Sequence, residues 1–226
     1  METIFSVITP SGGKRPRALQ EAIRSLEESV RLSGAIPGQV ELLVGFDGVK
    51  GQRPETALPA RFVDFPKSPG GFGNMIRDSL IRIAKGSHLL FLDDDNAYAP
   101  MAIALFRQHL AYEMIIGRVD TSRAFEITMI PVAGEPVGKA VRQGNIDPLC
   151  LCLSKELVAT RCGGWGNEGG YESDYRNILR YYRRAQSVVL LDEIVGTYDA
   201  GAGLDSQGLN LRQMRKHSPL PPLPRD

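Results

Sequence analysis

Short apolar runs alternate with amphipathic segments through the first half of the chain. The run 4–9 is rich in β-branched residues and predicts a strand, and apolar residues at helical spacing predict a helix over 15–32. The same alternation predicts strands over 39–46, 61–65 and 89–92, with a helix over 74–84. Strands and helices in this order predict an α/β fold with a parallel central sheet and right-handed crossovers.

The second half of the chain has a weaker pattern. We expect a helix over 100–110, because Pro100 suits a first helical turn, and apolar stretches predict strands over 113–119 and 124–130. The stretch 132–144 has the composition of a loop. The remaining predicted elements are an apolar segment at 149–153, helices over 155–160 and 172–184, and a strand over 187–191.

Length, charge and cysteine content narrow the class of protein. A chain of 226 residues suits one large domain, and 27 basic against 26 acidic residues give a formal net charge of +1. This balance offers no overall electrostatic attraction for nucleic acid. The odd number of cysteines, three, suits a reducing compartment.

The sequence predicts no membrane anchor. The first residues lack the basic and apolar regions of a signal peptide, and no stretch reaches the roughly 20 apolar residues of a membrane span. We therefore expect a cytoplasmic protein. The segment 212–226 is basic and rich in proline, which is typical of a loose tail that makes at most a peripheral membrane contact.

Three consecutive carboxylates, Asp93, Asp94 and Asp95, follow the apolar run 89–92. Such a run is typical of a buried strand, and open α/β sheets bind ligands beyond the carboxyl ends of their strands. A divalent cation that carries a phosphorylated ligand would relieve the repulsion among the carboxylates. The alternative is a solvated acidic turn, because Asp favours turns. On a strand, Asp93 and Asp95 would share one side and Asp94 would point away.

Other predicted strands also end in polar residues. Thr9 closes the first strand and Asp47 follows the second, so both would face the same crevice as the three carboxylates and form a nucleotide pocket with them. A glycine-rich loop at 70–73 opens the next helix, and Arg77 lies one turn into it, near the site that a helix start offers to phosphate. The alternatives are turn-forming roles for Thr9 and Asp47 and a solvent-exposed position for Arg77.

The segment 11–15 resembles a phosphate-binding loop only superficially. It lacks the first glycine at the required spacing and the hydroxyl residue after Lys14. We interpret it as a turn, with a phosphate contact by Arg15 or Arg17 as the weaker alternative.

A second acidic cluster follows another glycine-rich loop. Glu172 and Asp174 lie near the start of the helix predicted over 172–184, where carboxylates also act as helix caps. A carboxylate beside a mobile loop suits a general base as well. The loop carries the only tryptophan, Trp165, whose ring could stack on the apolar face of a sugar.

In this order, the motifs resemble those of inverting glycosyltransferases of family 2, which have the GT-A fold with a Rossmann-like, mostly parallel central sheet flanked by helices. The resemblance spans about residues 4–200. Each matching segment is a weak signal by itself, and the ordered set is more specific. The segments are 5–10, 44–48, 73–78, 84–95, 144–147 with 153–157, and 163–180.

The resemblance implies donor-side roles for individual residues. Asp93 and Asp95 correspond to the two acids of the DxD motif, so Asp95 would bind Mn²⁺ or Mg²⁺ directly and Asp93 would contact ribose or metal-bound water. Asp94 becomes the variable middle residue, on the donor side. Asp47 would hydrogen-bond the nucleobase. The other implied donor contacts are Thr9, Pro10 and Arg77.

The resemblance also implies a general base, Asp174. The family usually has a Glu-Asp pair at this place, whereas this chain has Ser173 before Asp174. Glu172, one place earlier, therefore remains the alternative base.

Two further implications concern the acceptor and the phosphates. Trp165 and Gly164 would lie on the acceptor side. Near 198–201 the family often has a histidine that completes the metal or diphosphate site, and in this chain Asp199 could take that place.

As a whole, the resemblance implies transfer of a sugar from a nucleoside-diphosphate sugar, a UDP-sugar by default, to an unknown hydroxyl acceptor with inversion. One domain would extend over 1–211, with a nucleotide-binding half at 1–98 and an acceptor-side half at 99–211. The alternatives are a non-catalytic protein that binds nucleotide sugars and a DxD-type aspartyl phosphatase, although the phosphatase motif normally follows the first strand.

Overall fold

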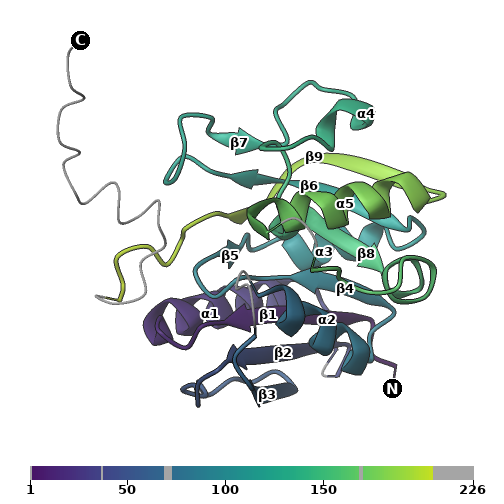
Figure 1. Ribbon diagram of the computed structural model, residues 1–226. Helices are drawn as coiled ribbons and strands as arrows, with labels where there is room; N and C mark the ends of the chain where they lie inside the picture. The colour runs from purple at the N-terminus through teal and green to yellow at the C-terminus, as the bar shows by residue number, and fades with distance from the viewer. Residues whose placement is uncertain (1, 37, 69–72, 168–169, 206–226) are drawn as a thin grey trace, which may run out of the picture.

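The computed structural model describes residues 2–36, 38–68, 73–167 and 170–205, and within them nine strands form one sheet flanked by helices (Figure 1). The strands are β1 (Phe5–Ser11), β2 (Val40–Asp47), β3 (Ala60–Phe65), β4 (His88–Phe91), β5 (Ala97–Tyr98), β6 (Met114–Asp120), β7 (Met129–Ile130), β8 (Leu151–Ser154) and β9 (Val188–Thr197). The helices are α1 (Pro16–Leu32), α2 (Asn74–Ile83), α3 (Ala102–Gln108), α4 (Val137–Ala140) and α5 (Ser173–Arg184), with shorter turns at Pro148–Cys150, Glu156–Arg161 and Gly170–Glu172. Most of the glycine-rich loop predicted at 70–73 and the whole tail predicted at 212–226 lie outside the described residues.

The first half of the chain builds the parallel part of the sheet. β1 pairs in parallel with β2 on one side and with β4 on the other, and β2 pairs in parallel with β3. Every residue of β1 is buried, as expected of a strand covered on both faces. The order of strands and helices predicted for the first half is therefore confirmed, with small shifts in the element bounds.

The second half of the chain continues the same sheet with mixed pairing. β8 is antiparallel to both β4 and β6, β9 is parallel to β6, and the short β5 is antiparallel to β9. The described strands therefore run in the order β3-β2-β1-β4-β8-β6-β9-β5, with β7 paired to β6. The carboxyl ends of β1, β2 and β4 meet at one edge, and the strands of the second half extend the sheet beside them.

The strand predicted over 124–130 is wrong along most of its length, because only Met129–Ile130 is a strand. The preceding residues fold back as a turn: the amide of Thr121 donates to the carbonyl of Thr128, and its hydroxyl donates to the carbonyl of Ile127 at 2.5 Å. These local bonds replace a strand ladder. The loop predicted over 132–144 likewise contains the short helix α4, next to which the Asn145 side chain donates to the carbonyl of Ala140.

The longer helices each bury one face in the core. α1 places small and apolar residues in the core, and its Ser29 hydroxyl accepts the amide of Ile103, which ties α1 to α3. α2 and α5 lie in front of the sheet in the view of Figure 1. Amphipathic helices of this kind gain their stability mainly from packing against the core.

Among the described residues, no helix combines the length and the apolar character that crossing a bilayer requires.

Candidate active site

A cavity of about 480 Å³ lies at the edge where β1, β2 and β4 end. This is the edge at which open α/β sheets bind ligands. Most of the residues singled out from the sequence line this cavity, although they come from distant parts of the chain: Pro10, Asp47, Arg77, Asp93, Asp94, Asp95, Glu172 and Asp174. Thr9, Gly164 and Trp165 are not part of its wall.

The acidic cluster lies in a turn and not on a strand. β4 ends at Phe91, so the alternation of a strand does not extend to the three carboxylates. Asp94 does not point away: it is the most buried of the three, and its carboxylate accepts the Ser11 hydroxyl at 2.6 Å. The guanidinium of Arg15 pairs with both Asp94 and Asp95. The interpretation as a solvated acidic turn is therefore wrong for Asp94 and Asp95, which are 1% and 8% exposed.

Burial makes two of these carboxyl groups weaker acids than an ordinary aspartate. It raises the pKa of Asp95 to about 7, with Asp94 and Asp93 adding to the rise and Arg15 opposing it. It also raises the pKa of Asp94, against the opposing effects of Arg15 and Ser11. Since the ionised forms are costly here, additional positive charge at this place would be favourable.

Arg77 is a buried residue that joins the two acidic clusters. Its side chain is 2% exposed, with Nη2 at 2.6 Å from Asp93 and Nη1 at 3.6 Å from Asp174. The guanidinium also lies 5.2 Å from the centre of the Trp165 ring. Burial alone would lower the pKa of Arg77, but Asp93 and Asp174 outweigh it and raise the pKa. The alternative of a solvent-exposed arginine is therefore wrong.

A glycine brings Arg77 to the cavity. Gly73, which precedes α2, has φ of 70°, a conformation that favours glycine. A Cβ at this position would lie 2.8 Å from the Cβ of Pro10, and two carbon atoms that are not bonded to each other do not come this close. Gly73 therefore lets the start of α2 pack directly against the end of β1.

Asp174 and Glu172 both line the cavity but have different partners. Asp174 is 37% exposed as a side chain, and burial raises its pKa, with Arg77 lowering it and Asp93 raising it. Glu172 is more exposed and accepts a hydrogen bond from Gln143 at 2.9 Å. Only Asp174 is connected through Arg77 to the acidic cluster.

Ser173 explains why the chain lacks an acidic pair at this place. It is 1% exposed, and its hydroxyl donates to Oδ1 of Asn74 and accepts from Nδ2 of the same side chain. A glutamate here would bring a charge into a packed contact between α5 and α2. Ser173, at the place where the resemblance leads one to expect a glutamate, therefore has a packing role in this structure.

Trp165 lies where a sugar cannot reach its faces. It is 3% exposed, its Nε1 donates to Oδ1 of Asn74 at 2.9 Å, and its ring packs at 5.1 Å from that of Phe91. The carbonyl of Gly164 accepts the Tyr181 hydroxyl at 2.8 Å. Trp165, expected from the sequence to stack on a sugar, is thus a core residue whose ring packs against the guanidinium of Arg77.

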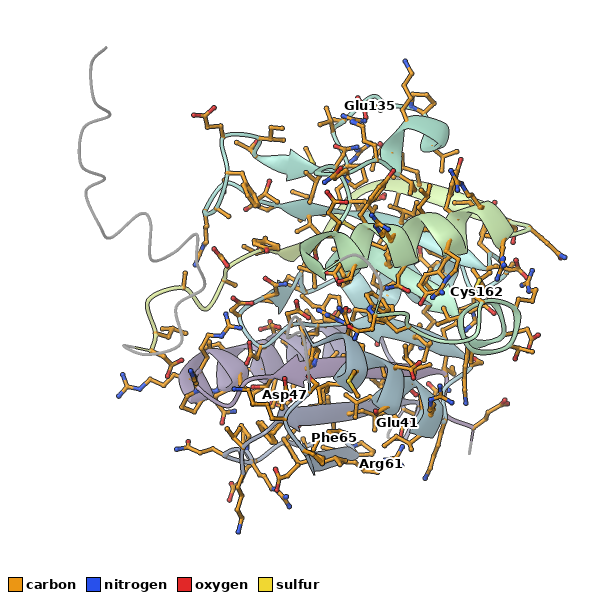
Figure 2. All side chains as sticks on the ribbon, viewed as in Figure 1. Glu41, Asp47, Arg61, Phe65, Glu135 and Cys162 are labelled. Carbon is orange, nitrogen blue, oxygen red and sulfur yellow. The ribbon has the colours of Figure 1, made fainter. Side chains whose placement is uncertain are left out.

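The remaining residues singled out from the sequence have varied places. Asp47 lies at the carboxyl end of β2, opposite the end that carries Glu41 (Figure 2), and its two carboxylate oxygens accept the amide and the hydroxyl of Ser68. Thr9 is fully buried behind the wall. Asp199 is buried with φ of 55°, and its amide donates to the side chain of Asn96.

The structure adds cavity residues that carry little or no signal in the sequence. Phe125 and Tyr198 both line the cavity, with ring centres 5.7 Å apart, and Phe125 is 46% exposed. Asp147 lines the cavity as a half-buried carboxyl that accepts the amide of Leu149 at 2.9 Å. Burial raises the pKa of Asp147 to about 8, with Asp93 and Asp174 adding to the rise.

The raised pKa of Asp147 predicts a pH-dependent stability. Between about pH 4 and pH 8 the folded protein keeps a proton that the unfolded chain has released, so the free energy of unfolding falls as pH rises. Asp147→Asn keeps an acceptor for Leu149 but removes this titration. We expect the variant to gain stability relative to the native protein from pH 5 to pH 9 in urea unfolding. A pH-independent difference would contradict the assignment.

The acidic cluster fits a divalent cation by its donor chemistry. Mg²⁺ and Mn²⁺ prefer carboxylate and phosphate oxygens, and carboxylates outnumber guanidinium groups along the cavity wall. Within the described part of the chain, no three His, Cys, Asp or Glu side chains already form a cage for an ion. Instead, Asp93 pairs with Arg77, and Asp94 and Asp95 pair with Arg15.

Comparisons with known proteins agree with this fold. A structure of S. aureus TarS 1–349 in complex with UDP matches with a TM-score of 0.64 and 15% identity, over 87% of this chain and 60% of that chain. The TarS 1–349 complex with UDP-GlcNAc gives 0.65 and 14%, over 94% and 61%. The mannosyltransferase PcManGT from Pyrobaculum calidifontis, in complex with GDP-Man and Mn²⁺, gives 0.60 and 15%, over 88% and 57%.

These similarities confirm the predicted fold class, a GT-A α/β fold. At such low identity they establish the fold alone, and the chain spans about 60% of the length of the matching TarS 1–349 structures. A comparison with protein-family models gives no match, and neither does a comparison with curated proteins.

Proposed function

We propose that this protein is a glycosyltransferase that moves a sugar from a nucleoside-diphosphate sugar to an acceptor hydroxyl group. The observation that carries the proposal is the acidic cluster at the edge where β1, β2 and β4 end, in a fold shared with structures that hold UDP, UDP-GlcNAc or GDP-Man. The cavity volume of about 480 Å³ lies within the range of small-molecule sites. The domain would extend over 1–211, with its nucleotide-binding half at 1–98 and its acceptor-side half at 99–211.

On the donor side, we assign the nucleobase to the end of β2, where Asp47 lines the cavity, and the diphosphate to the part of the cavity that Arg77 and the acidic cluster line together. Asp95 and Asp93 would hold Mn²⁺ or Mg²⁺. A divalent cation bound there would neutralise the charge that develops on the leaving nucleoside diphosphate. Arg77 contacts both Asp93 and Asp174, so it links this part of the cavity to the acceptor side.

On the acceptor side, Asp174 would take the proton from the attacking hydroxyl group. Its raised pKa makes it a stronger base than an ordinary carboxylate, and its partly exposed side chain faces the cavity. In-line attack at the anomeric carbon would invert its configuration. Phe125 and Tyr198, and not Trp165, offer aromatic surface to a sugar ring in this cavity.

The arrangement gives no support to an aspartyl phosphatase. The carboxylates follow β4 and not the first strand, and the most buried of them, Asp94, is taken up by Ser11 and Arg15.

Nucleotide binding tests the proposed function. We expect UDP or GDP to bind the native protein in calorimetry more tightly with Mn²⁺ than without it, and Asp95→Ala to abolish the metal-dependent part. Glu21→Ala, at an exposed site on α1, is the matched control and should behave as the native protein. Absence of binding by the native protein would contradict the function, and unchanged affinity and metal dependence in Asp95→Ala would contradict the metal assignment.

A further inference from the structure

Arg15 lies at the place where a cation is expected. Its Nη2 is 2.6 Å from Oδ1 of Asp94, and its Nη1 contacts Oδ2 of Asp95. The Arg15 side chain is 23% exposed, whereas those of Asp94 and Asp95 are 1% and 11% exposed. One guanidinium therefore pairs with two buried carboxylates and leaves a net negative charge, and it reaches them from the solvent side of the pair.

The surrounding contacts hold the two carboxylates unequally. Asp94 has a second partner, the Ser11 hydroxyl, at 2.6 Å. For the side chain of Asp95, Arg15 is the one hydrogen-bonding partner recorded among the described residues. Arg15 can therefore release Asp95 while it stays anchored on Asp94.

The start of α1 does not provide an alternative anion site. The amides of Arg17 and Ala18 already donate to the carboxylate of Asp205, which closes the exposed start of this helix. The amide of Gly201 donates to the carbonyl of Asp95 at 2.9 Å and fixes the backbone below the pair. Near the acidic cluster, the group that can meet a phosphate is thus Arg15, the residue that precedes α1.

Charge decides what Arg15 would do when a donor binds. Carboxylates outnumber guanidinium groups along the cavity wall, so a diphosphate alone meets net repulsion. A guanidinium forms two parallel hydrogen bonds to phosphate as readily as to carboxylate. If positive charge from a cation replaces Arg15 on Asp95, the guanidinium becomes available to the donor.

We propose that Arg15 is an exchangeable counter-ion, which occupies Asp95 in the empty site, yields it to a divalent cation and turns to the donor diphosphate. This inference rests on the proposed function and deepens it. It implies that cation and nucleotide bind cooperatively. When the Arg15–Asp95 pair breaks, the cation takes the place of Arg15 on Asp95 and the diphosphate takes the place of Asp95 on Arg15. By linkage, the cation must tighten nucleotide binding by the same factor as the nucleotide tightens cation binding.

Mn²⁺ binding in the absence of nucleotide tests this exchange. The electron paramagnetic resonance signal of the free ion measures how much Mn²⁺ is bound. Arg15→Met removes the competitor, so we expect its Mn²⁺ affinity to exceed that of the native protein about tenfold or more, which corresponds to about 1.4 kcal/mol. In the native protein UDP should tighten Mn²⁺ binding, after the Mn²⁺ held by free UDP is subtracted, and in Arg15→Met the factor of this tightening should be smaller. Arg24→Met, at an exposed arginine further along α1, should change neither quantity.

A second variant guards against misfolding, because Arg15→Met leaves the buried Asp94 with a single partner. Arg15→Lys keeps a positive charge but cannot form two parallel hydrogen bonds. We therefore expect a smaller gain in Mn²⁺ affinity, and a smaller effect of UDP on Mn²⁺ binding than in the native protein. Unchanged or weaker Mn²⁺ binding in both variants would overturn the role of Arg15 while UDP binding by the native protein upholds the proposed function. Failure of the native protein to bind UDP or GDP with Mn²⁺ would overturn both.

Discussion

The Asp174→Asn variant is expected to bind the nucleotide donor normally and to lose transfer by a factor of about 10² to 10⁴, the usual contribution of a positioned general base. Asn keeps the size of the side chain but cannot accept a proton from the acceptor. Asp174 is suited to this task because burial raises its pKa, while Arg77 at 3.6 Å holds the carboxylate toward the cavity. Release of nucleoside diphosphate under saturating donor measures the loss.

Glu172→Gln is the matched control for this substitution. Glu172 also lines the cavity, but its partners are Gln143 and Arg176, whereas the partner of Asp174 is Arg77. We expect it to keep most of the activity. The raised pKa of Asp174 further predicts that transfer rises with pH as Asp174 loses its proton, at a higher pH than an ordinary carboxyl would require. Full activity in Asp174→Asn with loss in Glu172→Gln would exchange the two assignments.

Replacing Arg77 with Met is expected to lower the free energy of unfolding by about 1–3 kcal/mol, because the two carboxylates that lose their buried partner are themselves partly exposed to solvent. Arg77 is 2% exposed and contacts Asp93, Asp174 and the ring of Trp165. Met preserves the apolar stem but leaves two carboxylates without their shared cation. Urea unfolding, analysed by linear extrapolation, measures the change.

Arg82→Met, on the same helix, is the control for this loss of charge. Arg82 is 72% exposed and pairs with Asp78 across one helical turn. Because exposed pairs contribute little, we expect a change below about 0.5 kcal/mol. A similarly small change in Arg77→Met would show that Arg77 does not support the two acidic clusters.

The sequence predicted the parts of the fold that local pattern determines. The alternation of apolar strands and amphipathic helices up to β4 was enough to place Asp47 and the acidic cluster at one edge of a parallel sheet. The strand ends carry polar residues because they meet solvent and ligand there, and this contrast is visible in a single sequence.

Other features depend on contacts between distant segments, which no local pattern contains. The glycines around Trp165 suggested a mobile, exposed ring, but its bond to Asn74, 91 positions away, places it in the core. Asp94 was expected to point away because a strand was extended past Phe91, whereas the turn directs it to Ser11. The pairing of Arg15 with Asp94 and Asp95 spans about 80 positions and was visible only as a weak phosphate-loop likeness.

A crystal structure with UDP and Mn²⁺ tests the central claim most directly, namely that the cavity at the ends of β1, β2 and β4 holds a nucleoside-diphosphate sugar. We predict density for the nucleobase beside Asp47, for the diphosphate in the part of the cavity that Arg77 and the acidic cluster line, and for the ion on Asp95. Asp174 should lie across the cavity, open to an acceptor. Nucleotide bound elsewhere on the protein, with the cavity empty, would contradict the account.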